Sequence, residues 1–164
     1  MSTDNPFAPP KADVADVNGA AGAAQAAPPL WNPRAAAGWS LLFSPLFGSL
    51  IHMKNWQALG EPGKATTCRL WAIACAVFIV ATAFSVVLPN TKTVDMAFRA
   101  VGFALLLGWY YSIGREQNGF VLARYGEGYP RRGWLQPVLL AFAGIAAFVV
   151  LIFIVGTLSG TLDS

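Results

Sequence analysis

The sequence predicts an all-α integral membrane protein: a helical bundle of three transmembrane helices with a Pro/Gly-broken segment before them. Three apolar stretches predict the transmembrane helices, at residues 70–88, 94–113 and 135–158. The first and last contain no charged residue, and ~19 to 24 helical residues are long enough to cross a hydrocarbon core of ~30 Å. Composition agrees, because only 12% of the residues are charged, against about a quarter in soluble domains.

The first 34 residues have a different composition from the rest. Alanine, proline and glycine dominate positions 20–29, and little in this region could form a core. We therefore expect a disordered tail over residues 1–34 and a polytopic membrane domain over residues 35–164. The tail has no basic stretch followed by an apolar one, so we expect no cleaved signal peptide.

The segment 35–53 is long enough to span but is broken by Gly38, Pro45 and Gly48. Two arrangements are open: a re-entrant or interfacial segment, giving three spans, or a fourth transmembrane helix. In the first arrangement every lysine and arginine except Lys92 and Arg99 lies on one side of the membrane. The positive-inside rule makes that side the cytoplasm and favours the re-entrant segment.

Three tryptophans mark one membrane interface. Trp71 opens one span, Trp109 closes the next and Trp134 opens the last. Arg131 and Arg132 precede Trp134, where we expect them to anchor the loop on the cytoplasmic side. Within the loop at 114–133, the apolar pattern predicts a short amphipathic helix on the membrane surface.

Small residues predict where helices pack closely. Ala100, Ala104 and Gly108 repeat at four-residue spacing in the middle span. Such a stripe lets helix backbones approach one another in a bilayer. We expect it to form the bundle within one chain, with a homodimer seam as the alternative.

No residue pattern predicts chemistry. His52 is the only histidine, and no nearby cysteine or carboxylate spacing predicts a metal site. The basic residues form no continuous stripe of the kind that binds nucleic acid. We therefore expect no catalytic, cofactor-binding or metal-binding residue, and no enzymatic activity.

Several short blocks resemble a group of proteins. NPFAPP at 5–10 is similar to an NPY/F-x-(A/P)-P leader, with Phe7 in place of the usual tyrosine. The blocks FSPLFG at 43–48 and NWQALG at 55–60 resemble F-x-P-x-F-G and N-W-x-x-L-G. Both blocks are typical of small, uncharacterised bacterial inner-membrane proteins. The resemblance implies a multi-pass protein of the bacterial inner (cytoplasmic) membrane and brings no activity with it.

These observations predict a non-enzymatic protein that binds another membrane component, as an accessory or immunity-type protein does. The alternative is a subunit of a homo-oligomeric channel or transporter, in which the break at Pro45 acts as a gate. The expected partners are the lipid bilayer and another membrane protein, with further copies of the chain as the alternative.

Overall fold

Helices make up every named element in residues 26–88 and 91–160, the part of the chain that the computed structural model describes. In chain order the elements are α2 (Pro33–Phe43), α3 (Pro45–Ala58), α4 (Pro62–Phe84), the 3-10 turn η1 (Ser85–Val87), α5 (Lys92–Trp109), the π-helical η2 (Tyr110–Gly114), α6 (Glu116–Tyr125) and α7 (Leu135–Leu158). Most of the predicted tail, residues 1–25, lies outside the described residues.

Three helical stretches are long and apolar enough to cross a membrane: Pro62–Val87, Lys92–Tyr125 and Leu135–Leu158. The prediction of a helical membrane protein with three candidate spans is confirmed. The first helix begins eight residues earlier than the predicted span, at Pro62, because proline suits the first helical position. The second continues through η2 into α6. Hydropathy alone did not predict either extension, because the added residues are polar or a mixture of polar and apolar types.

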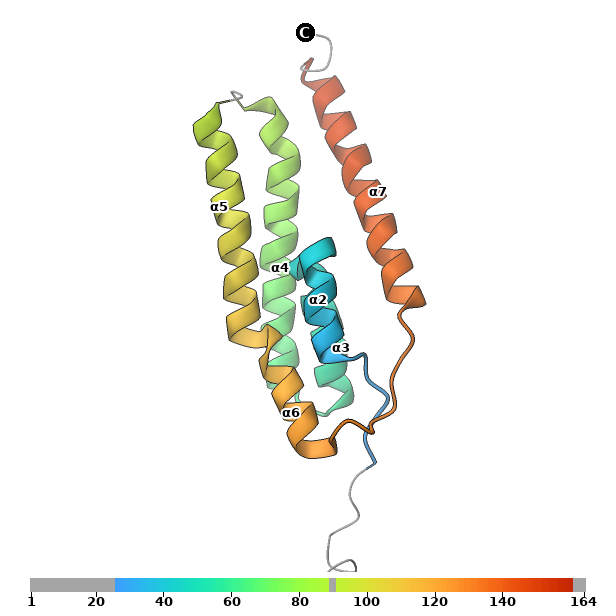
Figure 1. The fold of residues 1–164 in the computed structure, drawn as a ribbon. Helices are drawn as coiled ribbons and strands as arrows, with labels where there is room; N and C mark the ends of the chain where they lie inside the picture. The colour runs from blue at the N-terminus through green and yellow to red at the C-terminus, as the bar shows by residue number, and fades with distance from the viewer. Residues whose placement is uncertain (1–25, 89–90, 161–164) are drawn as a thin grey trace, which may run out of the picture.

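The broken segment folds as two short helices, α2 and α3, that form a hairpin. Ser44 interrupts the helix with a φ of 110°, and Pro45 then starts α3. The Asn55 side chain near the end of α3 bonds the backbone of Trp31 just before α2, which brings the two ends of the segment together. Figure 1 shows α2 and α3 side by side, with α2 between α5 and α7.

Buried amides tie the base of this hairpin to the rest of the bundle. The Asn55 Oδ1 accepts from the Trp31 N–H at 3.0 Å, and Asn55 Nδ2 donates to the Trp31 carbonyl at 2.8 Å. Asn55 Nδ2 also donates to Gln117 Oε1 at 2.9 Å, and Gln117 Nε2 donates to the His52 carbonyl at 2.9 Å. We call the hydrogen bonds of these two side chains the amide clamp. Because Asn55 and Gln117 are both buried, the clamp satisfies polar groups that water cannot reach.

The segment before α2 belongs to the folded structure. Leu30 is fully buried. Its N–H donates to the Pro130 carbonyl at 3.0 Å, and its carbonyl accepts from the Arg132 N–H at 2.8 Å. Val121 of α6 packs against Leu30. The described residues at the end of the predicted tail are therefore packed. The helix predicted in the loop at 114–133 is α6, a short helix whose apolar side lies against this segment.

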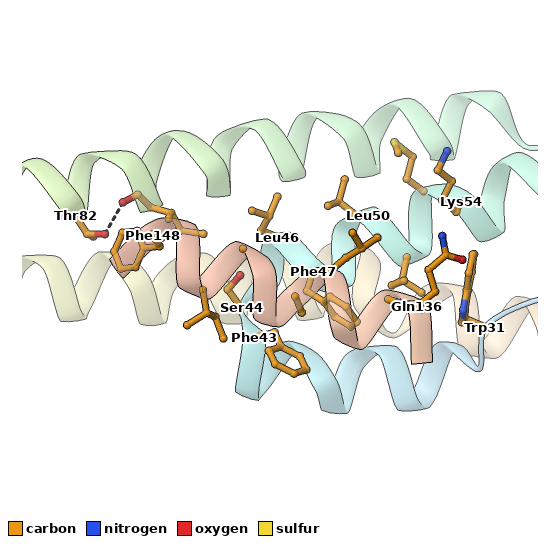
Figure 2. A pocket seen from close by; sticks show the side chains of 18 residues that line it. Trp31, Phe43, Ser44, Leu46, Phe47, Leu50, Lys54, Thr82, Gln136 and Phe148 are labelled. Atoms are coloured by element: carbon orange, nitrogen blue, oxygen red, sulfur yellow. Dashed lines mark hydrogen bonds between the residues drawn. The ribbon is translucent and has the colours of Figure 1, made fainter. Parts of the chain in front are cut away.

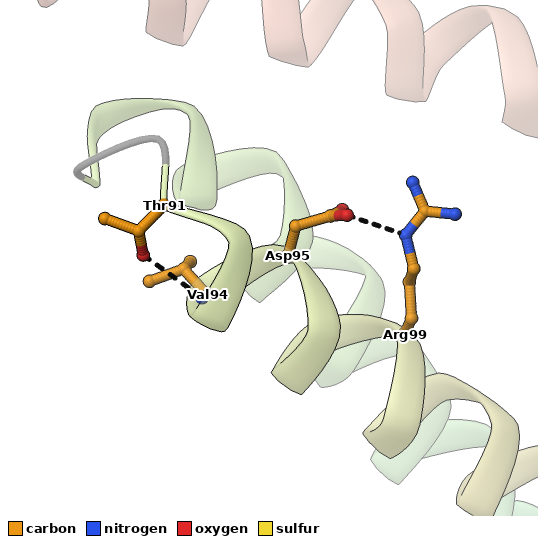
Figure 3. Close-up of polar contacts among 4 residues, drawn as sticks. All are labelled: Thr91, Val94, Asp95 and Arg99. Carbon is orange, nitrogen blue, oxygen red and sulfur yellow. Dashed lines mark hydrogen bonds and ion pairs between the residues drawn. The ribbon is translucent and has the colours of Figure 1, made fainter.

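The end of the bundle opposite the hairpin base carries the contacts that start α5. Thr91 caps α5 by accepting from the Val94 N–H at 3.3 Å. Asp95 and Arg99, one turn apart, form an ion pair at 2.9 Å (Figure 3). Both side chains are more than half exposed, so this pair contributes little to stability. Lys92 and Arg99 thus lie on α5 near its start, away from the basic residues of α4 and α6.

A close contact in the core joins α3 to the end of α5. Gly48 of α3 lies against the buried ring of Trp109 and the hydroxyl of Ser40. A Cβ at Gly48 would overlap both side chains, so only glycine fits here. The same tryptophan ring lies over Gly114, where a Cβ would come within 3.1 Å.

We expect Gly48→Ala to lower the free energy of unfolding by about 1–3 kcal/mol, the usual cost of overpacking a core. Gly38→Ala is the matched control, because Gly38 is also helical and has nothing within 4 Å of its Cβ position. The control should be neutral or stabilising by up to about 1 kcal/mol. Thermal denaturation in mild detergent measures both, and equal stability of the two variants would contradict this packing.

Candidate functional site: the cleft beside α7

An apolar cleft of about 710 Å³ lies between α7, the α2–α3 hairpin and α4. We call it the α7 cleft. Its walls include Leu46, Leu50 and Ile51 of α3, Ile79 and Thr82 of α4, and Leu140, Gly144, Ile145 and Phe148 of α7. Protein interiors are close-packed, so a space of this size beside an apolar helix is a place where apolar groups from outside the chain can enter.

Aromatic side chains bridge α7 to the hairpin at the edge of the cleft. The Phe43 and Phe142 rings meet edge to face at 5.3 Å, and Trp134 lies 6.3 Å from Trp39 and 6.4 Å from Phe47. Farther along, α7 contacts α4 and η1. The first half of α7 is therefore held mainly through side chains, which leaves its backbone at a distance from α3 (Figure 1).

The α7 cleft has a polar end and an apolar end. Figure 2 shows Lys54, Gln136 and Trp31 at one end and Phe148 with Thr82 at the other. The Thr82 hydroxyl donates to the Ile79 carbonyl at 2.6 Å and so adds no free donor to the cleft. The lining is otherwise almost entirely apolar, which suits an apolar occupant whose polar end lies near Lys54.

Small residues of α7 lie exposed beside the cleft. No atom lies within 4 Å of a Cβ built on Gly144, and Ala143 and Ala147 are exposed. None of the residues in the most apolar window of α7 is buried by the rest of the chain. In a bilayer, exposed small residues let another helix approach closely.

Four of the sequence-predicted residues lie where α7 meets the hairpin. Arg132 stacks over the Trp31 ring at 4.7 Å, Arg131 lies over the Tyr129 ring at 5.5 Å, and Trp134 packs on the hairpin. Pro45 begins α3 beside the cleft. The structure therefore brings Trp134, Arg131, Arg132 and Pro45 to the side of the molecule where α7 meets the hairpin.

Trp109 has a different place from the one expected of an interfacial ring. It is fully buried at the end of α5 and packs against Gly48, Gly114 and the ring of His52. Gly108, in contrast, packs against Trp71, where a Cβ would come within 3.1 Å of the ring.

The other two members of the predicted small-residue stripe do not share that contact. Ala100 and Ala104 are exposed. The stripe on α5 therefore contributes one close contact within the chain, through Gly108.

Sequence reasoning missed most residues that shape the cleft and the clamp. Nothing in the sequence around Asn55 and Gln117 indicates a partner, and only their burial and their mutual hydrogen bond show what they do. Gly144 lies in an alanine-rich helix where small residues occur everywhere. A detectable signal was the spacing of Ala143, Gly144 and Ala147, which at i, i+1 and i+4 lie on one side of α7.

His52 is buried near the clamp and outside the three candidate spans. Its ring meets the Trp109 ring edge to face at 5.6 Å. Burial lowers the pKa of His52 to about 4. Among the described residues, no group of three or more histidine, cysteine or carboxylate side chains could hold a metal ion.

Comparisons with known protein families, with curated proteins and with solved structures found no match for this chain. The interpretation of the α7 cleft therefore depends on its own geometry.

We expect stability to fall as pH drops from about 6.5 to about 4. The unfolded His52 takes up a proton near its ordinary pKa of 6.5, whereas the folded form does so only near 4. Stability is therefore complete above pH 6.5, and protonation of the unfolded state removes up to about 3 kcal/mol by pH 4. Thermal denaturation against pH measures this, and His52→Gln should flatten the dependence. An unchanged dependence in that variant would exclude His52 as its source.

Proposed function

We propose that this protein is a non-enzymatic, multi-pass protein of the bacterial inner membrane that binds another membrane protein, in the manner of an accessory or immunity-type protein. The α7 cleft is the binding place. The observation that carries this proposal is an apolar space of about 710 Å³ beside the most apolar window of α7, in which the rest of the chain buries no residue.

A helix of a partner protein fits this place better than lipid alone. Lipid tails are as apolar as leucine, so apolar surface by itself does not select a partner within a bilayer. A close approach of two helix backbones does select a partner. Ala143, Gly144 and Ala147 allow such an approach beside the cleft. Bulky side chains of the partner then fill the space between Leu50 and Leu140.

The proposed topology places the hairpin base in the cytoplasm. In this arrangement α2 and α3 form a re-entrant hairpin, and the three candidate spans cross the membrane. The supporting facts are the contacts that join Trp31 to Asn55 and the basic residues of α4, α6 and the loop before α7, which gather at that end. The positive-inside rule gives the direction.

Site-specific photo-crosslinking in cells tests the proposed function. A photoreactive residue at Leu140, on the wall of the cleft, should give a discrete adduct heavier than the chain. Gly144→Leu should abolish that adduct, because its side chain projects into open space in the cleft wall. Ala146→Leu is the matched control, since it is exposed on α7 about 200° around the helix from Gly144.

Three outcomes separate the alternatives. An adduct lost in Gly144→Leu and kept in Ala146→Leu supports a protein partner at the cleft. An adduct of twice the chain mass, containing this chain alone, would replace the proposal with the homo-oligomeric channel or transporter. A crosslink to lipid alone would contradict both.

A further inference from the structure

A second groove, on the opposite side of α2 from the α7 cleft, has a volume of about 570 Å³. We call it the arginine groove. Four residues of α2 line it at the i, i+3, i+4, i+7 spacing of one helix face: Arg34, Ala37, Gly38 and Leu41. The other wall comes from the end of α5, from η2 and from the start of α6. Contacts of α2 with η2 and α6 close its base.

Two arginines at the base of this groove lack a counter-charge in the described part of the chain. Arg34 comes from the first turn of α2, and Arg115 from the junction of η2 and α6. Arg115 lies 5.5 Å from the Tyr111 ring centroid, which orients its guanidinium without neutralising it.

The carboxylates of the described chain are engaged elsewhere or form no ion pair with these arginines. Glu116 pairs with Lys64 at 2.8 Å and Asp95 with Arg99 at 2.9 Å. Neither Glu61 nor Glu127 forms an ion pair within the described residues. Two positive charges therefore face the same groove without a neutralising partner from residues 26–88 and 91–160.

The rest of the groove is apolar and leads away from the arginines. Leu41 lies two turns beyond Arg34 on α2, about 10 Å along the helix. Leu41, Phe103 and Leu107 are 72%, 62% and 40% exposed. The groove thus combines a cationic end with an apolar wall that is open to the side of the bundle.

We propose that the arginine groove binds an anionic phospholipid, with its phosphate between Arg34 and Arg115 and an acyl chain along Leu41, Phe103 and Leu107. Guanidinium groups bind phosphate oxygens through paired, charge-assisted hydrogen bonds. Asn118, which also lines the groove, adds an amide donor for the headgroup. Basic pockets between membrane helices on the cytoplasmic side are a suitable geometry for such headgroups.

A lipid fits better than a soluble phosphate compound. The exposed apolar wall would remain uncovered beside a soluble anion, whereas an acyl chain covers it. The groove is also separate from the α7 cleft, because the two lie on different faces of α2. Lipid binding here is therefore independent of the proposed protein partner.

Native mass spectrometry of the full chain in mild detergent tests the proposal, with phosphatidylglycerol and phosphatidylcholine as probes. The native chain should prefer phosphatidylglycerol. The double variant R34Q/R115Q should bind it at least about tenfold more weakly, since both phosphate contacts are lost. The control R69Q/R124Q removes two exposed charges outside the groove and should keep the preference.

A second pair of variants tests the acyl-chain position without changing charge. Gly38→Leu fills the groove, because nothing lies within 4 Å of its Cβ position. Gly119→Leu adds the same side chain on α6 outside the groove. Lost binding in Gly38→Leu and retained binding in Gly119→Leu supports the proposal. Equal affinity for the two lipids, or equal loss in R69Q/R124Q and R34Q/R115Q, would overturn it.

Discussion

The amide clamp of Asn55 is the interaction on which the arrangement of the helices depends. Its side chain bonds both the N–H and the carbonyl of Trp31 and reaches Gln117 as well. All of this occurs where Asn55 and Gln117 are almost completely buried. Removing the amide would leave several buried polar groups unpaired, each at about 1–3 kcal/mol. The clamp therefore joins the start of α2, the end of α3 and the start of α6 into one base.

The position of α2 follows from that base, and both candidate binding sites follow from the position of α2. One face of α2 presents Phe43 to the α7 cleft, and another presents Arg34 and Leu41 to the arginine groove. The contact of Gly48 with Trp109 sets how closely α3 approaches α5. A short helical hairpin thus keeps α5 and α7 apart and leaves an apolar space on each side.

Hydropathy and charge were sufficient to predict three apolar helices, because burial in lipid requires long uncharged runs. The break at Pro45 was also visible, and the structure has a helix start there. Hydropathy could not predict the reversal at Ser44, because it depends on a positive φ at a single residue. The roles of Asn55, Gln117 and Arg115 were equally hidden, since each depends on a partner distant in the sequence.

In the proposed topology, α2 and α3 enter and leave the membrane on the same side. Single-cysteine accessibility in intact cells tests it most directly, with cysteines at Ala26, Gln57, Gly128 and Thr91 in a chain whose Cys68 and Cys75 are replaced by alanine. With a re-entrant hairpin, a membrane-impermeant reagent added outside should label Thr91 alone, and the other three cysteines should react only after the cells are opened. Labelling of Ala26 together with Thr91 from outside would make the segment a fourth span and rule out the re-entrant hairpin.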